Sequence, residues 1–378
     1  MSDLQTALAP IFLENFTERG ELGAAVSVWR DGQEVVSLAA GYRERERKHP
    51  WDAGTMVLVY SATKGPAAAC VLKCLWDAGI GLDEPVATLW PHFSLAGKGR
   101  ITLGEVLSHR GGLAALDDPP DVFDYRGVIR ELEKQETLWE PGDGHGYHPR
   151  TSGYLWDEIV RRVTGRPLGA YWRETIADRL GLDFYIGLPE RLLPEVATLY
   201  AARTAPVEDA FLKAFAETGS LTNRAFGSPR GLFSVSSMNT AAARMTPFPA
   251  FGGIGTARAL GRFYGALACG GEEAGVAPGA VEAMTRRRSN GFDLVLRMEN
   301  AFSAGFLQDP VNEEGEKMRA TFGPSVRAFG QVGAGGSVAF ADPDRGIGFG
   351  YVMNQMEPGV LPNAKSLLLI KRMYEVLG

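Results

Sequence analysis

The sequence predicts an α/β fold of the α+β type, in which an antiparallel sheet is flanked by helices and carries an inserted, mostly helical domain. Two hairpin patterns near opposite ends of the chain predict the sheet. Residues 24–39 hold two β-prone runs around Asp31-Gly32, a strong hairpin signal. Residues 336–353 repeat this arrangement around a turn at 342–346. We therefore expect strands from both ends of the chain to share one sheet.

Helical patterns flank and separate these hairpins. Apolar residues recur at helical spacing in residues 4–19, and residues 362–377 indicate a closing helix. Further helical patterns, joined by loops rich in Gly and Pro, occupy residues 103–109, 122–136, 151–164 and 168–180. We expect residues 1–100 and 253–378 to form a discontinuous sheet domain and residues 101–252 to form the insertion. The cleft between the two domains is then the expected place for an active site.

Composition excludes several classes of function. The hydrophobic content of 45% and charged content of 22% are typical of a soluble globular protein. A formal charge of −6 argues against a nucleic-acid-binding surface, which would be basic. No apolar run approaches the length of a membrane span, and the N-terminus lacks the features of a signal peptide. The three cysteines do not suggest a disulfide framework, so we expect a cytoplasmic protein.

Metal and cofactor sites are not expected. The five histidines show no metal-ligand spacing such as H-E-x-x-H, and we expect no cofactor. The expected partner is a small-molecule substrate, and the sequence leaves the oligomeric state open.

Ser61 and Lys64 form the most informative motif. They lie where an apolar run, residues 56–60, leads into a helical pattern that continues to Gly79. Side chains three positions apart share a helix face, so the Lys64 amine can reach the Ser61 hydroxyl. A serine hydroxyl needs such a base to act as a nucleophile. The strand-to-helix position also offers free backbone N–H groups and a helix dipole to a developing negative charge.

Two loops supply further candidates. Tyr147 lies in the breaker-rich loop 140–148, where its hydroxyl can shuttle a proton in a cleft, or its ring can pack under the loop. Residues 331–336 contain clustered glycines before the first strand of the C-terminal hairpin. Such glycines permit close approach of a substrate to backbone N–H groups, which can form half of an oxyanion hole, or they form a tight turn only.

These motifs, in this order, resemble those of the penicillin-recognising serine hydrolases: class C β-lactamases, D-alanyl-D-alanine carboxypeptidases and family VIII carboxylesterases. Ser61 to Lys64 is similar to the S-x-x-K motif of that family. Tyr147 falls where the family places the tyrosine of Y-x-N, and residues 331–333 fall where it has K-T-G or H-x-G. Residues 101–113 are similar to a structural stretch of the family, T-x-x-x-L-L-x-H-x-x-G-L. The resemblance covers nearly the whole chain and implies a β-lactamase/transpeptidase-like fold.

The resemblance also implies roles for individual residues. Ser61, Lys64 and Tyr147 are the expected catalytic residues. The backbone N–H groups of Ser61 and Ala334 are expected to form the oxyanion hole. Substrate-binding contacts are expected from His148, Gln331 and Gly333.

Two departures from the family pattern favour the esterase branch. Pro149 replaces the Asn of Y-x-N, and neutral Gln331 replaces the Lys that binds the carboxylate of β-lactams and cell-wall peptides. We therefore expect a serine hydrolase that cleaves carboxylic esters through an acyl-enzyme on Ser61. A β-lactamase, a D-aminoacyl peptidase or an acyltransferase on the same fold remains an alternative, as does a catalytically silent binding protein. Whether Lys64 or Tyr147 is the immediate base is open, because their titrations are expected to be coupled.

Overall fold

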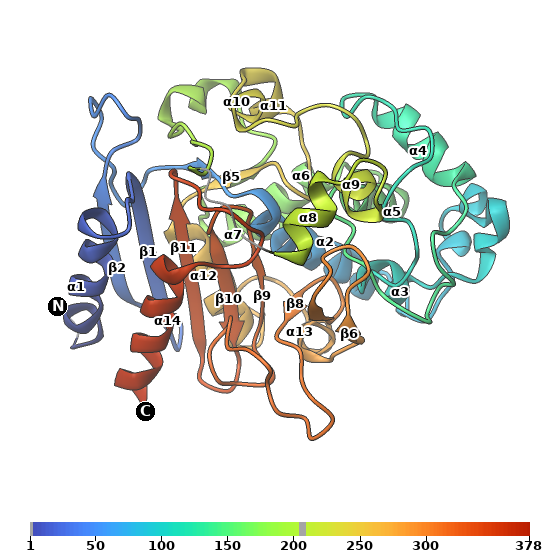
Figure 1. The fold of residues 1–378 in the computed structure, drawn as a ribbon. Coiled ribbons are helices and arrows are strands. Elements are labelled where there is room, and N and C mark those ends of the chain that lie inside the picture. The colour runs from blue at the N-terminus through green and yellow to red at the C-terminus, as the bar shows by residue number, and fades with distance from the viewer. Residues whose placement is uncertain (1–2, 204–208) are drawn as a thin grey trace.

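The computed structural model describes residues 3–203 and 209–378, in which one eight-stranded antiparallel sheet organises the fold (Figure 1). Its strand order is β2-β1-β11-β10-β9-β8-β7-β6. The strands are β1 (Gly23–Arg30), β2 (Gln33–Gly41), β6 (Ser289–Phe292), β7 (Glu299–Phe302), β8 (Leu307–Gln308), β9 (Phe329–Val332), β10 (Val338–Asp342) and β11 (Ile347–Met353). The sheet and the helices packed on it confirm the predicted fold class.

The two predicted hairpins meet inside this sheet. β1 runs antiparallel to β11, with Val26 opposite Tyr351. The N-terminal hairpin turns at Asp31 and Gly32, whose φ angles are 49° and 78°. A two-residue type I′ turn requires positive φ at both positions, which explains the Asp-Gly pair. The two ends of the chain thus complete one sheet.

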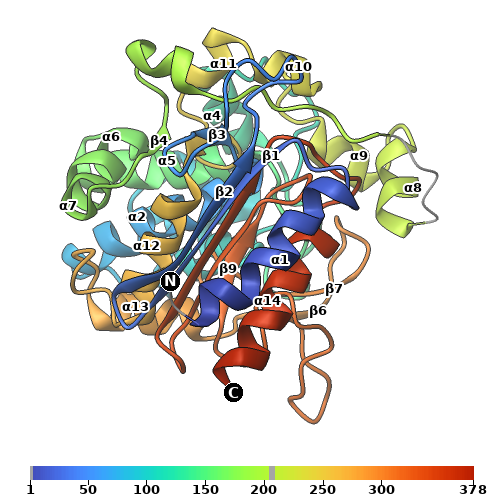
Figure 2. The same cartoon turned by 90° about the vertical axis from the view of Figure 1, so that its left-hand side faces the viewer.

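Helices cover both faces of the sheet. α1 (Asp3–Thr17) and α14 (Ala364–Leu377) lie side by side on one face (Figure 2). α12 (Ala257–Ala268) packs on the other face against β11 and β1. A Cβ added to Gly348 of β11 would lie 2.1 Å from the backbone nitrogen of Gly265 in α12. Glycine is required there because the helix approaches the strand backbone directly.

The middle of the chain is mostly helical. Its helices are α3 (Leu103–Leu107), α4 (Tyr125–Lys134), α5 (Thr151–Thr164), α6 (Leu168–Trp172), α7 (Asp178–Leu180), α8 (Ala210–Ala216), α9 (Leu221–Phe226), α10 (Val235–Met238) and α11 (Ala241–Met245). A small sheet joins β3 (Val57–Leu58), β5 (Gly253–Gly255) and β4 (Phe184–Ile186) in that order. This sheet links the middle segment to residues on both sides of it, and the division into domains at residues 101 and 252 stays a prediction.

Shorter elements complete the description. They are η1 (Tyr60–Thr63), α2 (Lys64–Asp77), η2 (Val86–Thr88), η3 (Pro91–Arg100), η4 (Arg173–Ala177), η5 (Glu190–Glu195) and α13 (Pro278–Thr285). The helix expected over residues 168–180 is three consecutive segments, because π-helical η4 separates α6 from α7. The helix expected from residue 122 begins at Tyr125, since the Asp124 side chain caps it by accepting the Gly127 N–H. Within the described ranges, no helix is both long enough and apolar enough to cross a bilayer.

Candidate active site

Ser61 sits on a sharp turn between β3 and α2. The preceding residue, Tyr60, has a φ of 46°, a left-handed conformation that is uncommon for a bulky residue. This conformation turns the chain from the strand into the 3₁₀ turn η1, and the Thr63 hydroxyl donates a hydrogen bond back to the Tyr60 carbonyl. The helix expected from Ser61 therefore starts with a 3₁₀ turn, and α2 proper begins at Lys64.

The Lys64 side chain is completely buried beneath Ser61. Its Nζ lies 2.8 Å from the carbonyl oxygens of both Pro149 and Ala250 and 3.5 Å from the Ser61 Oγ. Burial lowers the pKa of the Lys64 amine well below its usual value. In the neutral amine, two N–H groups serve the two carbonyls and the lone pair faces the Ser61 hydroxyl. The structure thus places a buried amine beside the Ser61 hydroxyl.

The Tyr147 side chain joins this pair. Its ring lies 4.6 Å from the Lys64 Nζ, and its side chain is hydrogen bonded to that of Ser61. Phe302 stacks on the ring, with centroids 6.0 Å apart and planes 7° apart. Burial raises the pKa of the Tyr147 phenol, so at neutral pH the hydroxyl is protonated and able to donate. The structure thus brings the three expected catalytic residues together.

A buried carboxylate that the sequence did not single out fixes the Tyr147 loop. The Asp293 oxygens accept the backbone N–H of Tyr147 at 3.0 and 3.2 Å, and Oδ1 also accepts those of Val295 and Leu296. Burial raises the pKa of Asp293, while these hydrogen bonds act against the shift. A carboxylate held by several backbone donors forms a rigid connection between the two loops.

Two histidines lie behind Tyr147 in the interior. The His148 ring receives the Leu113 N–H at Nε2 (2.9 Å) and donates from Nδ1 to the Gly146 carbonyl (2.7 Å). Its Nδ1–H tautomer is therefore fixed, and burial lowers its pKa to about 4. His109 packs 5.1 Å from the Tyr147 ring. The structure does not bring His148 together with the residues that line the cleft, because both of its ring nitrogens are occupied by the backbone.

Ser61 and Ala334 line the same pockets, and within the described part of the chain each carries an unpaired backbone N–H group. The amides of Ser61 and Ala334 have no hydrogen-bond partner among the described residues, whereas the neighbouring Gly333 amide donates to the Ser337 carbonyl at 2.7 Å. Gly333 must be glycine, because a Cβ there would lie 2.1 Å from the Val59 carbonyl oxygen. This close contact brings the 331–336 loop beside the strand that leads to Ser61. Free backbone amides beside a nucleophile are the groups from which an oxyanion hole is built, and that role for Ser61 and Ala334 stays a prediction.

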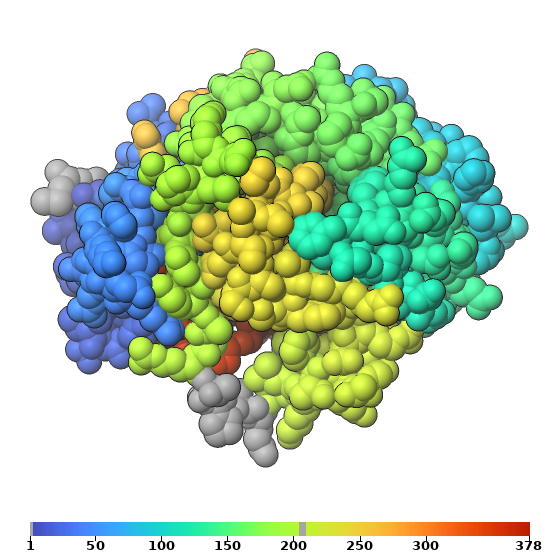
Figure 3. Space-filling model, turned by 90° about the horizontal axis from the view of Figure 1, so that it is seen from above, coloured from blue at the N-terminus to red at the C-terminus, as the bar shows by residue number. Residues whose placement is uncertain are grey.

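Two pockets open on Ser61. The narrow one has a volume of about 40 Å³ and is lined by Ser61, Tyr147, Phe226, Leu296, Asn300, Phe302, Leu307, Gln331, Val332, Ala334, Val360 and Leu361. The wide one has a volume of about 540 Å³ and is lined by Tyr60, Ser61, Pro149, Arg150, Phe215, Asn223, Phe226, Gly227, Leu232, Phe233, Met238, Phe251 and Ala334. From above, the surface is hollowed between the yellow-green residues of α8 and α9 and the yellow residues beside them (Figure 3).

Of the three residues expected to bind substrate, Gln331 is the one that lines a pocket containing Ser61. It lines the narrow pocket, and its amide Nε2 donates to the Gly305 carbonyl at 2.9 Å.

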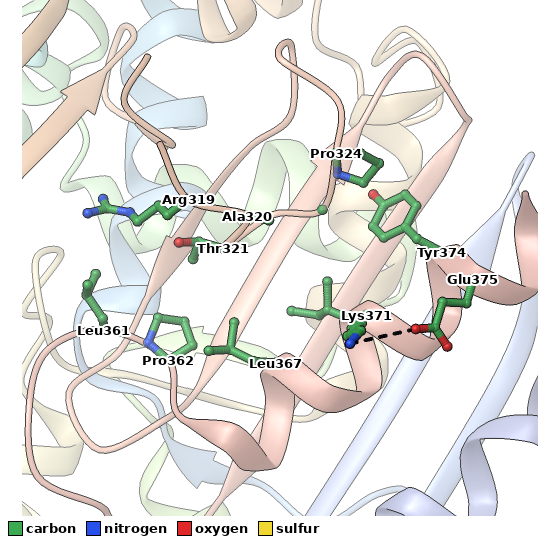
Figure 4. A pocket seen from close by; sticks show the side chains of 12 residues that line it. Arg319, Ala320, Thr321, Pro324, Leu361, Pro362, Leu367, Lys371, Tyr374 and Glu375 are labelled. Atoms are coloured by element: carbon green, nitrogen blue, oxygen red, sulfur yellow. Dashed lines mark ion pairs between the residues drawn. The ribbon is translucent and has the colours of Figure 1, made fainter. Parts of the chain in front are cut away.

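A further cavity of about 630 Å³ lies between α14 and residues 319–324 (Figure 4). It shares Leu361 with the narrow pocket but contains no catalytic candidate. Among the described residues, no His, Cys, Asp or Glu side chains gather as a metal site.

Comparisons with known proteins identify the family of this chain. The sequence profile of the β-lactamase family matches residues 11–370. The esterase/beta-lactamase LipL of Mycobacterium tuberculosis is 32% identical over 361 residues, covering 91% of this chain and 80% of its own length. A penicillin-binding protein homologue from Caulobacter crescentus is 36% identical with a TM-score of 0.88, covering 99% of this chain and 98% of its own. A family VIII carboxylesterase is 30% identical with a TM-score of 0.88 and the same two coverages. The chain therefore belongs to the β-lactamase family, and it is a hydrolase of that fold with esterase relatives.

Proposed function

We propose that this chain is a carboxylesterase that works through an acyl-enzyme on Ser61. The observation that carries the proposal is the Lys64 amine, which is buried, tied to two carbonyl oxygens, and 3.5 Å from the Ser61 Oγ. A neutral amine at this position is a competent general base for a serine hydroxyl. Because the cluster is intact, a catalytically silent binding protein is the weaker alternative.

The proton path follows from the opposite pKa shifts of two groups. Lys64 is pushed toward its neutral form and Tyr147 is held as a neutral phenol. Lys64 therefore accepts the Ser61 proton as the hydroxyl attacks the ester carbonyl. The amides of Ser61 and Ala334 bind the resulting oxyanion. Tyr147 protonates the leaving alkoxide and regains a proton from Lys64, and the two groups titrate as a coupled pair.

Water then resolves the acyl-enzyme by the reverse path. With the alcohol gone, a water molecule occupies the position of the leaving oxygen beside Tyr147. It loses its proton to the Tyr147–Lys64 pair as it attacks the acyl carbonyl. Collapse of the second tetrahedral intermediate returns a proton to the Ser61 oxygen and releases the acid.

Esters are favoured over β-lactams because the narrow pocket offers no cation. Gln331 occupies the position where a lysine would bind a carboxylate, and its amide donates to Gly305. Pro149 stands where the family pattern has an Asn, so the side-chain amide that would contact the substrate is missing. The Pro149 carbonyl accepts a hydrogen bond from Lys64. β-Lactamase activity remains the second candidate, because LipL carries both names; peptidase and acyltransferase activities are further alternatives.

A labelling experiment tests this proposal. A fluorophosphonate should add once to the native protein, and the mass shift should map to the peptide that contains Ser61. Ser61→Ala should abolish both the adduct and the hydrolysis of p-nitrophenyl acetate. Thr63→Ser, two residues after Ser61 in the same 3₁₀ turn, is the matched control and should still be labelled. Labelling that survives Ser61→Ala would remove the basis of the proposal.

A further inference from the structure

Arg150 is a buried cation in the wall of the wide pocket. Arg150 directly precedes α5, and only 7% of its surface is exposed. The guanidinium lies 5.5 Å from the Phe233 ring centroid and 5.0 Å from that of Phe251. It donates hydrogen bonds to the carbonyls of Phe226 (3.3 Å) and Gly231 (2.7 Å). A guanidinium carries five N–H donors, so three remain without a partner among the described residues.

The charge of Arg150 is not neutralised by a carboxylate. No Asp or Glu forms an ion pair with it in the described part of the chain; Asp121 and the phenols of Tyr60 and Tyr154 act on it only at longer range. Burial lowers its pKa to about 10, so the group is a cation at neutral pH. Of the described residues that line the two pockets containing Ser61, Arg150 alone has a charged side chain. A buried charge without a counter-ion is costly, and because Arg150 lines a pocket that contains Ser61, a ligand bound there is placed to supply the anion.

If the proposed function holds, the two pockets also indicate where the alcohol and the acyl group of an ester bind. Tyr147 lines the narrow pocket but not the wide one. The leaving alkoxide must accept the Tyr147 proton, so the alcohol occupies the narrow pocket. This pocket is the smaller of the two, so it favours a compact alcohol over an extended one. The acyl group then enters the wide pocket, whose walls include four phenylalanines.

We propose that the preferred substrates are small-alcohol monoesters of dicarboxylic acids, with the free carboxylate of the acyl group bound by Arg150. The apolar part of the acyl chain lies against the aromatic wall between Ser61 and the guanidinium. A planar guanidinium fork can bind both oxygens of a carboxylate, which a lysine cannot match. The hydrolysis consumes one water and releases the diacid and the alcohol.

The competing explanation is that Arg150 only fastens the 226–231 segment to the start of α5. Arg244 is a matched control for that role. It is also buried, at 9% exposed, and donates to the Ala197 carbonyl (3.3 Å) and the Asn239 side chain (3.1 Å). It does not line either pocket that contains Ser61.

The first experiment uses the wild-type protein and two probes of the same length. Monomethyl suberate carries a terminal carboxylate, and the methyl ester of suberic acid monoamide carries a neutral amide in its place. We expect kcat/KM for the anion to exceed that for the amide by about tenfold to a hundredfold, the range for a charge-assisted hydrogen bond. Monomethyl glutarate and monomethyl adipate have shorter acyl chains, so their kcat/KM values show which chain length spans the distance from Ser61 to Arg150.

The second experiment uses variants. Arg150→Met should reduce the anion-to-amide ratio to about one or below, and Arg150→Lys should retain part of it. Arg244→Met should leave the ratio at its wild-type value even where it lowers the melting temperature. If Arg150→Met fails to fold, Arg150→Lys and inhibition of the wild-type protein by suberate against its diamide make the same comparison.

The outcomes separate this inference from the proposed function. Equal rates for the anion and the amide, or a preference for the amide, would overturn the inference while leaving an active esterase. An equal loss of the ratio in Arg244→Met would also overturn it. A protein that cleaves no ester and takes no label at Ser61 would instead overturn the proposed function.

Discussion

Both carboxylate oxygens of Asp293 accept the backbone N–H of Tyr147, a residue 146 positions earlier in the chain. Among the described residues, no hydrogen bond joins this carboxylate to the Tyr147 hydroxyl or to Ser61; its contact is with the Tyr147 backbone, while its charge helps to raise the pKa of the phenol. It fixes where the loop places the phenol relative to the nucleophile. Since misplacement of a catalytic group by about 1 Å can cost a hundredfold in rate, this contact bears directly on activity.

Asp293→Asn should lower kcat by at least about tenfold and raise KM much less. The amide has one acceptor oxygen in place of two, and its NH₂ group faces the Tyr147 N–H. The loss of buried hydrogen bonds should also cost about 1–3 kcal/mol of stability. Asp342→Asn is the control, because Asp342 is buried and accepts hydrogen bonds from Ser325 and Tyr374 far from the cleft. A comparable fall in kcat in both variants, assayed well below their melting temperatures, would show a general effect of destabilisation.

Lys64→Ala and Tyr147→Phe should each reduce kcat by at least about a hundredfold, the usual contribution of a general acid–base group. The double variant should be little worse than either single one, because the two groups move one proton as a unit. Steady-state hydrolysis of p-nitrophenyl butyrate measures all three. Near-normal turnover of Tyr147→Phe would assign the proton transfer to another group.

Activity should fall on the acidic side as Lys64 takes up a proton. Because burial lowers the pKa of Lys64 in the folded protein, the amine is a free base over more of the neutral range than an exposed lysine. The acidic limb of the profile of log kcat/KM against pH should have a slope of one. An acidic limb that keeps its position in Lys64→Ala would have a different origin.

His148 should make the fold less stable in acid. Its folded pKa, about 4, is below the value of about 6.5 expected for the unfolded chain. The unfolded state therefore binds the proton first as pH falls, so the contribution is fully present above pH 6.5 and is lost progressively toward pH 4. The difference corresponds to about 3 kcal/mol for this group. The free energy of unfolding, measured by chemical denaturation between pH 7.5 and 4.5, should depend less steeply on pH in His148→Gln than in the wild-type protein. His92 is exposed, so His92→Gln should retain the wild-type dependence on pH.

Local signals in the sequence predicted much of the fold. The Asp31-Gly32 pair predicted the hairpin because a type I′ turn needs left-handed residues, and the structure has them there. The break in the helix over residues 168–180 left no comparable signal, since η4 differs from its neighbours only in hydrogen-bond register.

The candidate site was predictable where its residues belong to short motifs. Ser61 and Lys64 are one helical turn apart, so spacing alone relates them. Asp293 and Arg150 gave no such signal. The contact of Asp293 with Tyr147 depends on two loops that only the folded chain brings together. The burial that makes Arg150 unusual depends on the Phe233 and Phe251 rings, which are more than 80 positions away in the sequence.

Gln331→Lys should shift the preference from esters toward β-lactams. The Gln331 side chain lines the narrow pocket and donates to Gly305, and none of the described residues that line this pocket carries a cation. A charge-assisted hydrogen bond to a carboxylate is worth about 1.5–3 kcal/mol, or one to two decades in kcat/KM. The wild-type protein should favour p-nitrophenyl acetate over nitrocefin by several decades, and the variant should narrow that gap by improving the lactam. Gln331→Met, which adds no charge, is the control and should leave the lactam rate low. If the wild-type protein cleaves nitrocefin as fast as short esters, the missing cation is not what limits lactams, and β-lactamase becomes the leading function.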